Sequence, residues 1–237
     1  MADVDGGVDV VVARLERWLQ EHPPTTLLGL ADRLLIASVD RRRAEGPILA
    51  QRFATDVVTA ARSDEAVPAF STLCVCTATL QELGADVDDL RFALALVARV
   101  VVVDRYAEPF RSTARYWLWR AGLARSFVDD GVAPADPRLA FAFHTHRVLF
   151  ASCYGAAPVT DAPGWSEAKD GVDVDCGDSV ALLLLCAGCV GRTAEVQTLW
   201  RRLAELVRED GSLQTHVDSA AARHHAACVG VLAATFR

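Results

Sequence analysis

The segment DPRLAFAFHTHRVLFASCY, residues 136–154, decides the fold class. Its Asp-Pro start is typical of a helix that begins with a capping carboxylate followed by proline in the first turn. Residues of one face then recur at spacings of 4, 3, 4 and 3, the repeat of an amphipathic helix. They are Leu139, Phe143, His146, Phe150 and Cys153. The segment therefore predicts a helix with His146 on its buried face.

The same helical spacing recurs along the chain and predicts an all-α protein of about ten helices. The expected helices are 8–20, 25–42, 48–62, 66–83, 86–106, 109–124, 136–154, 175–190, 193–208 and 218–236. Most connections are short, which favours antiparallel neighbours. Two of the helices, starting near Asp86 and Asp173, have acids directly before a very apolar run. We therefore expect antiparallel helical hairpins in an α/α toroid-like or helical-repeat arrangement.

The chain of 237 residues has 52% hydrophobic residues, enough to bury a substantial core. We expect one all-helical domain over residues 1–237. Residues 155–174 are the exception to the short connections and contain four prolines or glycines after Gly155: Pro158, Pro163, Gly164 and Gly171. This segment is either a functional loop, a subdomain boundary or a solvated linker.

The charge and the apolar runs exclude two classes of partner. A formal net charge of -7, with no offsetting basic patch, argues against nucleic acid. The longest apolar stretches, 180–190 and 92–103, are shorter than the roughly 20 residues that span a bilayer, so no membrane span is expected. Lysine is nearly absent and Ala, Val, Arg and Asp abound, which is typical of a GC-rich bacterium.

The seven cysteines predict a reducing compartment. Their number is odd and most lie in apolar runs, where free cysteine behaves as a small core residue. The pair Cys186 and Cys189 forms a lone CxxC inside an apolar helix, which favours packing over redox chemistry. The acidic N-terminus lacks the basic-then-apolar order of a signal peptide. We therefore expect a cytoplasmic protein with free thiols.

Three residues are candidates for catalysis: His146, Asp175 and His224. His146 is either a hydrogen-bonded core residue or a ligand, general base or substrate contact. Asp175 either caps the apolar helix that follows, with Asp178 in the capping box, or directs an acid into an enclosed cavity. His224 shares a partly apolar stripe of the last helix with Cys228. The catalytic hypothesis requires all three to converge on one internal cavity.

A divalent metal such as zinc is a further hypothesis. His146, Asp175, Cys176 and His224 would make a chemically sensible ligand set. The spacing does not demand it, because the sequence has neither HExxH nor a paired CxxC. Packing and capping remain the alternative reading of the same residues.

The segment Asp175-Cys176-Gly177-Asp178 resembles the acid-rich helix start of class II terpenoid cyclases, apart from Gly177, where their pattern has an acid. The segment around His224 resembles the zinc-binding helix of protein prenyltransferase β-subunits, and Asp210-Gly211-Ser212 resembles a turn common in these α/α toroids. The resemblance implies a helical toroid around a cavity. It also implies His224 as a metal ligand, with Asp173 or Asp175 and Cys176 as loose counterparts of the others.

The order of these motifs is also similar to an uncharacterised actinobacterial helical family that is often encoded near natural-product genes. Thr145-His146, Gly155, Asp173 with Asp175, the Asp210-Gly211-Ser212 turn and His224 match it in order over 105–236. This resemblance implies a role in natural-product biosynthesis without naming a reaction.

Two functions are therefore expected as alternatives. The first is an enzyme of bacterial specialised metabolism, for tailoring or cyclisation, acting on a small molecule or peptide in a cavity lined by His and Asp. The second is a non-catalytic helical module that binds a partner protein or peptide. An enclosed, partly polar pocket favours the enzyme, whereas an exposed apolar patch favours the module. The sequence leaves substrate and oligomeric state open.

Overall fold

The computed structural model describes residues 4–39, 46–157 and 159–236. These residues form eleven α-helices and three short 3-10 helices, with no strand among them. A single isolated bridge joins Val207 and Leu213. The prediction of an all-α fold of about ten helices is confirmed.

The helices divide into two compact units, described one at a time. Unit 1 comprises Met1–Thr25 and Ala135–Arg237, and unit 2 comprises Thr26–Pro134. Residues 155–174, for which a subdomain boundary was one of the predictions, lie inside unit 1. They contain a short helix, α8 (Trp165–Asp170), whose Trp165 and Ala168 are buried.

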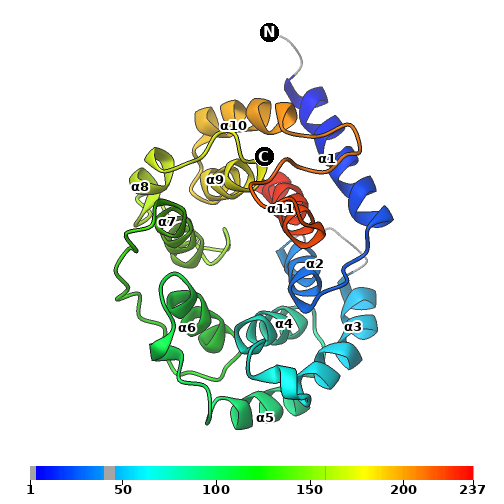
Figure 1. The fold of residues 1–237 in the computed structure, drawn as a ribbon, viewed down its shortest axis with the longest axis vertical. Helices are drawn as coiled ribbons and strands as arrows, with labels where there is room; N and C mark the ends of the chain where they lie inside the picture. The colour runs from blue at the N-terminus through cyan, green and yellow to red at the C-terminus, as the bar shows by residue number, and fades with distance from the viewer. Residues whose placement is uncertain (1–3, 40–45, 158, 237) are drawn as a thin grey trace. The chain divides into compact units, whose positions relative to one another are not determined.

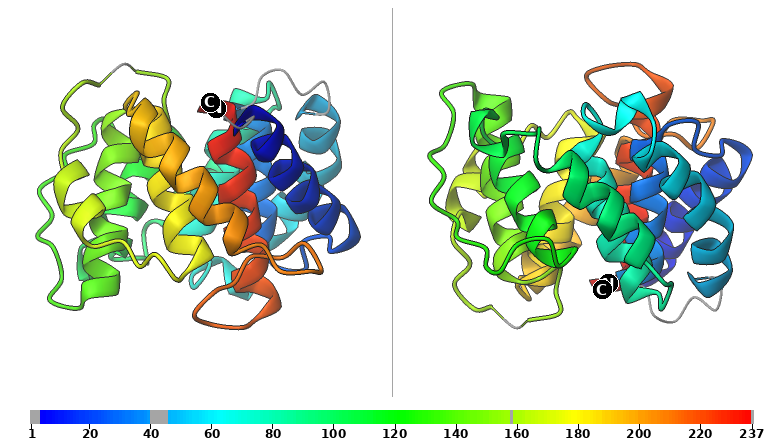
Figure 2. Two further views of the ribbon diagram at one scale, coloured as in Figure 1. Left: turned by 90° about the horizontal axis from the view of Figure 1, so that it is seen from above. Right: turned by 90° about the horizontal axis from the view of Figure 1, so that it is seen from below.

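Unit 1 is built around the apolar helix α9 (Gly177–Cys189). The other helices of the unit are α1 (Val4–Glu21), α7 (Pro137–Ala151), α8, α10 (Thr193–Glu205) and α11 (Ala220–Ala233). Helix α9 packs against both α10 and α11, which the views of Figures 1 and 2 show together. Helix α7 packs against α8 and α9, and α1 packs against α10 and α11. Because α9 has neighbours on several sides, it is apolar nearly all round.

The start of α7 follows the sequence prediction. The Asp136 carboxylate accepts hydrogen bonds from the backbone N–H groups of Arg138 (2.9 Å) and Leu139 (3.0 Å). Pro137 occupies the first turn, where its missing N–H costs nothing. Phe143 and Phe150 are buried, as the spacing predicted.

The start of α9 differs from the prediction that Asp175 caps it. The N-cap residue is Cys176, and its side chain makes no capping hydrogen bond. Instead, the N–H of Gly177 donates to the carbonyl of Gln214 at 2.7 Å. A Cβ at Gly177 would lie 2.8 Å from that same oxygen, so only glycine permits this approach. The loop before α11 thus contacts the N-terminal end of α9. Asp175 does not cap this helix.

The Asp210-Gly211-Ser212 segment forms the expected turn. Asp210 Oδ1 accepts hydrogen bonds from the N–H (2.9 Å) and hydroxyl (2.7 Å) of Ser212. These bonds lower the pKa of the Asp210 carboxyl. The N–H of Arg208 closes the turn on the carbonyl of Ser212 at 2.8 Å.

Unit 2 contains α2 (Leu27–Val39), α3 (Gly46–Ala61), α4 (Phe70–Glu82), α5 (Asp88–Val97) and α6 (Phe110–Arg120). Helix α4 packs against each of the others, which Figure 1 shows for α2 and α6. Its core includes Phe70, Leu73 and Leu80, which are almost fully buried. The C-terminal end of the helix expected at 25–42 falls partly on residues 40–42, outside the described residues.

All seven cysteines are free, as predicted, and six of them are buried. Burial raises the pKa of Cys74 to about 12 and that of Cys189 to about 12, and it raises the pKa of Cys186 well above its usual value. Such thiols are poor nucleophiles because the thiolate is disfavoured. The CxxC pair in α9 is therefore a packing element. Within the described ranges, no helix is both long and apolar enough to cross a membrane.

Candidate small-molecule pocket in unit 1

A cavity of about 460 Å³ lies within unit 1. Its walls come from the first turns of α7, residues 171–173, the start of α9, residues 215–217 and the start of α11. Pockets that hold small molecules are usually about 300–1,000 Å³. The segment 155–174 therefore contributes to a hollow surface and does more than link two helices.

One wall of the pocket carries an aspartate–histidine pair. Nε2 of His216 lies 2.7 Å from Oδ2 of Asp173. The other oxygen of Asp173 accepts the backbone N–H of Asp175 at 3.0 Å. This second bond orients the carboxylate, so that Oδ2 is directed to the imidazole. A carboxylate in this position fixes the orientation and tautomer of a histidine ring.

A second acid, Asp178, lines the pocket from the first turn of α9. Its Oδ1 is shielded from solvent and has no hydrogen-bond partner among the described residues. Nε2 of His225 lies 3.9 Å from that oxygen. The side chain of Asp178 as a whole is 39% exposed.

His146 lies close enough to His225 for the two rings to interact electrostatically. The pKa of His146 is lowered to about 4, first by burial and then by the nearby His225, while the carbonyl of Ala142 acts in the opposite direction. Its ring stacks on Phe150, with centroids 5.5 Å apart. His146 is therefore neutral at ordinary pH, and it does not line the pocket.

The remaining walls of the pocket are largely apolar. Phe141 and Ala142 come from α7, Leu182 from α9 and Ala222 from α11. Arg138 contributes a guanidinium from the exposed first turn of α7. The pocket thus combines an apolar side with a polar wall that carries the Asp173–His216 pair.

None of the three expected catalytic residues, His146, Asp175 and His224, lines this pocket. The side chain of Asp175 is 78% exposed, and Oδ1 pairs with Nη2 of Arg202 at 2.5 Å. Cys176 does line the pocket and is buried.

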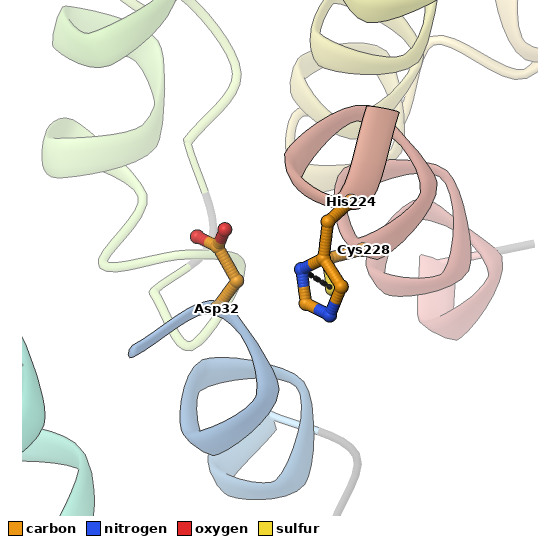
Figure 3. A group of neighbouring side chains, drawn as sticks. All are labelled: Asp32, His224 and Cys228. Carbon is orange, nitrogen blue, oxygen red and sulfur yellow. Dashed lines mark hydrogen bonds between the residues drawn. The ribbon is translucent and has the colours of Figure 1, made fainter. Parts of the chain in front are cut away.

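His224 lies in α11 and is 6% exposed. Its Nδ1 contacts Cys228 Sγ at 3.7 Å, one helical turn along, as Figure 3 shows. Its ring also lies 6.5 Å from that of Trp18 in α1. Figure 3 also labels Asp32, which belongs to α2 in unit 2.

The zinc hypothesis finds no ligand set within unit 1. Taken by itself, the described part of this unit brings no three His, Cys, Asp or Glu donor atoms within 4.8 Å of one another. Of the four expected ligands, Asp175 is occupied by Arg202 and His146 is stacked in the core. We therefore derive no chemical step through a metal.

Sequence reasoning singles out Asp175 for catalysis, but the acids that line the pocket are its neighbours Asp173 and Asp178. His216 lies in the loop before α11, and its pairing with Asp173 joins positions 43 residues apart. The Asp210-Gly211-Ser212 turn is the sequence feature that could have indicated His216, because it returns the chain toward the start of α9.

Comparison with known proteins adds no relative: no protein-family model, curated protein sequence or solved structure matches the chain.

Proposed function

We propose that unit 1 binds a small organic molecule and transfers a proton to or from it, with His216 as the acid–base group. The observation that carries this proposal is the Asp173–His216 pair, 2.7 Å apart, in the wall of a 460 Å³ pocket. Histidine is the side chain most often used for proton transfer, and an adjacent carboxylate stabilises the imidazolium that forms.

The proton would move at Nδ1 of His216. With Nε2–H directed to Asp173, the lone pair on Nδ1 can accept a proton from the substrate. The imidazolium is then paired with the carboxylate until it returns the proton to the product. Asp173 positions the ring, because its own orientation is fixed by the N–H of Asp175.

The apolar side of the pocket supports a substrate with a hydrocarbon or aromatic body. Phe141, Ala142 and Leu182 would contact it, while His216 meets the reacting group. The resemblance to terpenoid cyclases and to a natural-product family supports specialised metabolism as the setting. We therefore propose a natural-product tailoring or cyclisation enzyme of the acid–base type.

The test is proton exchange with solvent. The purified full chain is incubated in D2O with a small-molecule extract of a GC-rich bacterium, and mass spectra are compared before and after. We expect at least one metabolite to gain deuterium or to be converted. His216→Gln should abolish that change, whereas Asp161→Ala, at an exposed position away from the pocket, should preserve it. Equal turnover by the His216→Gln protein would refute the role of His216.

One observation in unit 2 favours the second candidate, a binding module. Phe92 and Leu96 lie four residues apart on α5 and are 69% and 47% exposed, and Val100 continues the stripe at 66%. Contiguous exposed apolar residues often mark a protein-binding surface. Under this alternative, Phe92→Ser would abolish capture of a partner and leave the chemistry of unit 1 unchanged.

A further inference from the structure

The polar wall of the pocket has more acid than base. Asp173 and Asp178 both line it, and Arg138 is the single arginine that does. With the histidines counted as neutral, these three side chains have a formal charge of -1. Arg138 lies in the exposed first turn of α7, where solvent screens its charge. The charge that faces the interior of the pocket is therefore negative.

Asp178 has an oxygen available for a ligand. Its Oδ1 is turned into the protein toward His225, at 3.9 Å, and is shielded from solvent. The side chain as a whole is 39% exposed and lines the pocket. A partly desolvated carboxylate without a hydrogen-bond donor is costly, and a ligand that donates a charged N–H removes that cost.

The start of α9 would at first favour an anion, because helix N-termini carry partial positive charge. Here that charge is already offset. The N–H of Gly177 donates to Gln214, and Asp178 places its own negative charge in the first turn. An anionic ligand would meet two carboxylates and gain little from the helix.

We infer that the pocket selects a small organic cation, a protonated amine on an apolar or aromatic body, with Asp178 as its counter-ion. This inference rests on the proposed function, because it concerns the same pocket. The apolar body lies against Phe141, Leu182 and Ala222, and the ammonium group lies between Asp178 and the Asp173–His216 pair. The volume of about 460 Å³ is in the range of pockets that hold small molecules.

Three probes that share one apolar body test the inference: phenethylamine, 2-phenylethanol and phenylacetate. Each is titrated into the full chain, and binding is followed by amide NMR shifts at Leu182 and Ala222. We expect the amine to bind at least about tenfold more tightly than the alcohol or the acid, as one charge-assisted hydrogen bond allows. Asp178→Asn should remove that preference, and Asp161→Asn should keep it.

The outcomes separate this inference from the proposed function. If the alcohol or the acid binds at these amides as tightly as the amine, selection of a cation is wrong while the pocket remains a small-molecule site. Amine preference that persists in a folded Asp178→Asn protein refutes the role of Asp178. If none of the probes shifts these amides, both the inference and the proposed pocket function fail.

Discussion

The imidazole of His146 stacks on the ring of Phe150 one helical turn along α7, with the two planes inclined by 9°. Burial in this position lowers the pKa of His146 to about 4, from an ordinary value of 6.5. A histidine held neutral in this way links the stability of the fold to pH. Because its pKa is lowered, His146 is uncharged at ordinary pH and can pack among apolar side chains.

The first prediction is a loss of stability in acid. Between pH 6.5 and 4 the unfolded chain binds a proton at His146 that the folded chain does not, so the free energy of unfolding falls as pH falls. The contribution is complete above pH 6.5, and up to about 3 kcal/mol is lost by pH 4.

Urea unfolding of His146→Leu and wild type at several pH values measures this effect. The His146→Leu curve should fall less steeply over the same range. Leu203→Ala serves as the control, because it removes buried apolar contacts in α10 without a titratable group and should lower stability by a similar amount at every pH. Parallel curves for wild type and His146→Leu would show that His146 is not the group responsible.

The second prediction concerns the cap of α7. Asp136→Ala removes the acceptor for two backbone N–H groups and should lower the free energy of unfolding by about 1 kcal/mol. Asp161→Ala, at an exposed aspartate outside any α-helix, should change it much less. Equal effects of the two substitutions would contradict the capping role of Asp136.

The third prediction compares two glycines with similar backbone conformations. Gly164 has φ +87°, and a Cβ there would lie 2.8 Å from the carbonyl oxygen of His144. Gly191 has φ +70°, and no described atom outside its immediate neighbours lies within 4 Å of its Cβ position. Gly191→Ala should cost roughly 1 kcal/mol for conformation alone. Gly164→Ala should cost clearly more, because backbone has to move. Calorimetry should therefore give a lower Tm for Gly164→Ala than for Gly191→Ala. Equal Tm values for the two variants would argue against the close contact at Gly164.

Helix positions were predictable because periodicity is a local property of the sequence. The segment 136–154 predicted the cap of α7 correctly. Of the residues expected on its buried face, Phe143 and Phe150 are buried, whereas Leu139, His146 and Cys153 are only half-buried. The segment 86–106 was predicted as one helix, but α5 ends at Val97 and a separate 3-10 helix, η2, covers Val103–Arg105. Apolar residues continue across this break, so hydrophobicity alone does not mark the end. Helix α8, six residues long, is too short to show a repeat.

The pocket was less predictable because its residues come together only through tertiary contacts. Asp175 was chosen for its place before an apolar helix, yet the hydrogen bond from Gly177 to Gln214 moves the cap to Cys176 and leaves Asp175 with Arg202. His216 is not among the site residues predicted from the sequence, because no local pattern places a loop histidine against Asp173. The closed toroid implied by the resemblance stays a prediction.

We propose that a small molecule binds in the cavity between α7, α9 and α11. Diffraction from crystals of the full chain soaked with a set of small organic fragments tests this binding site. We expect density for bound fragments between Phe141 and Leu182, within reach of His216. Fragments that gather elsewhere on the protein and leave this cavity empty would contradict it.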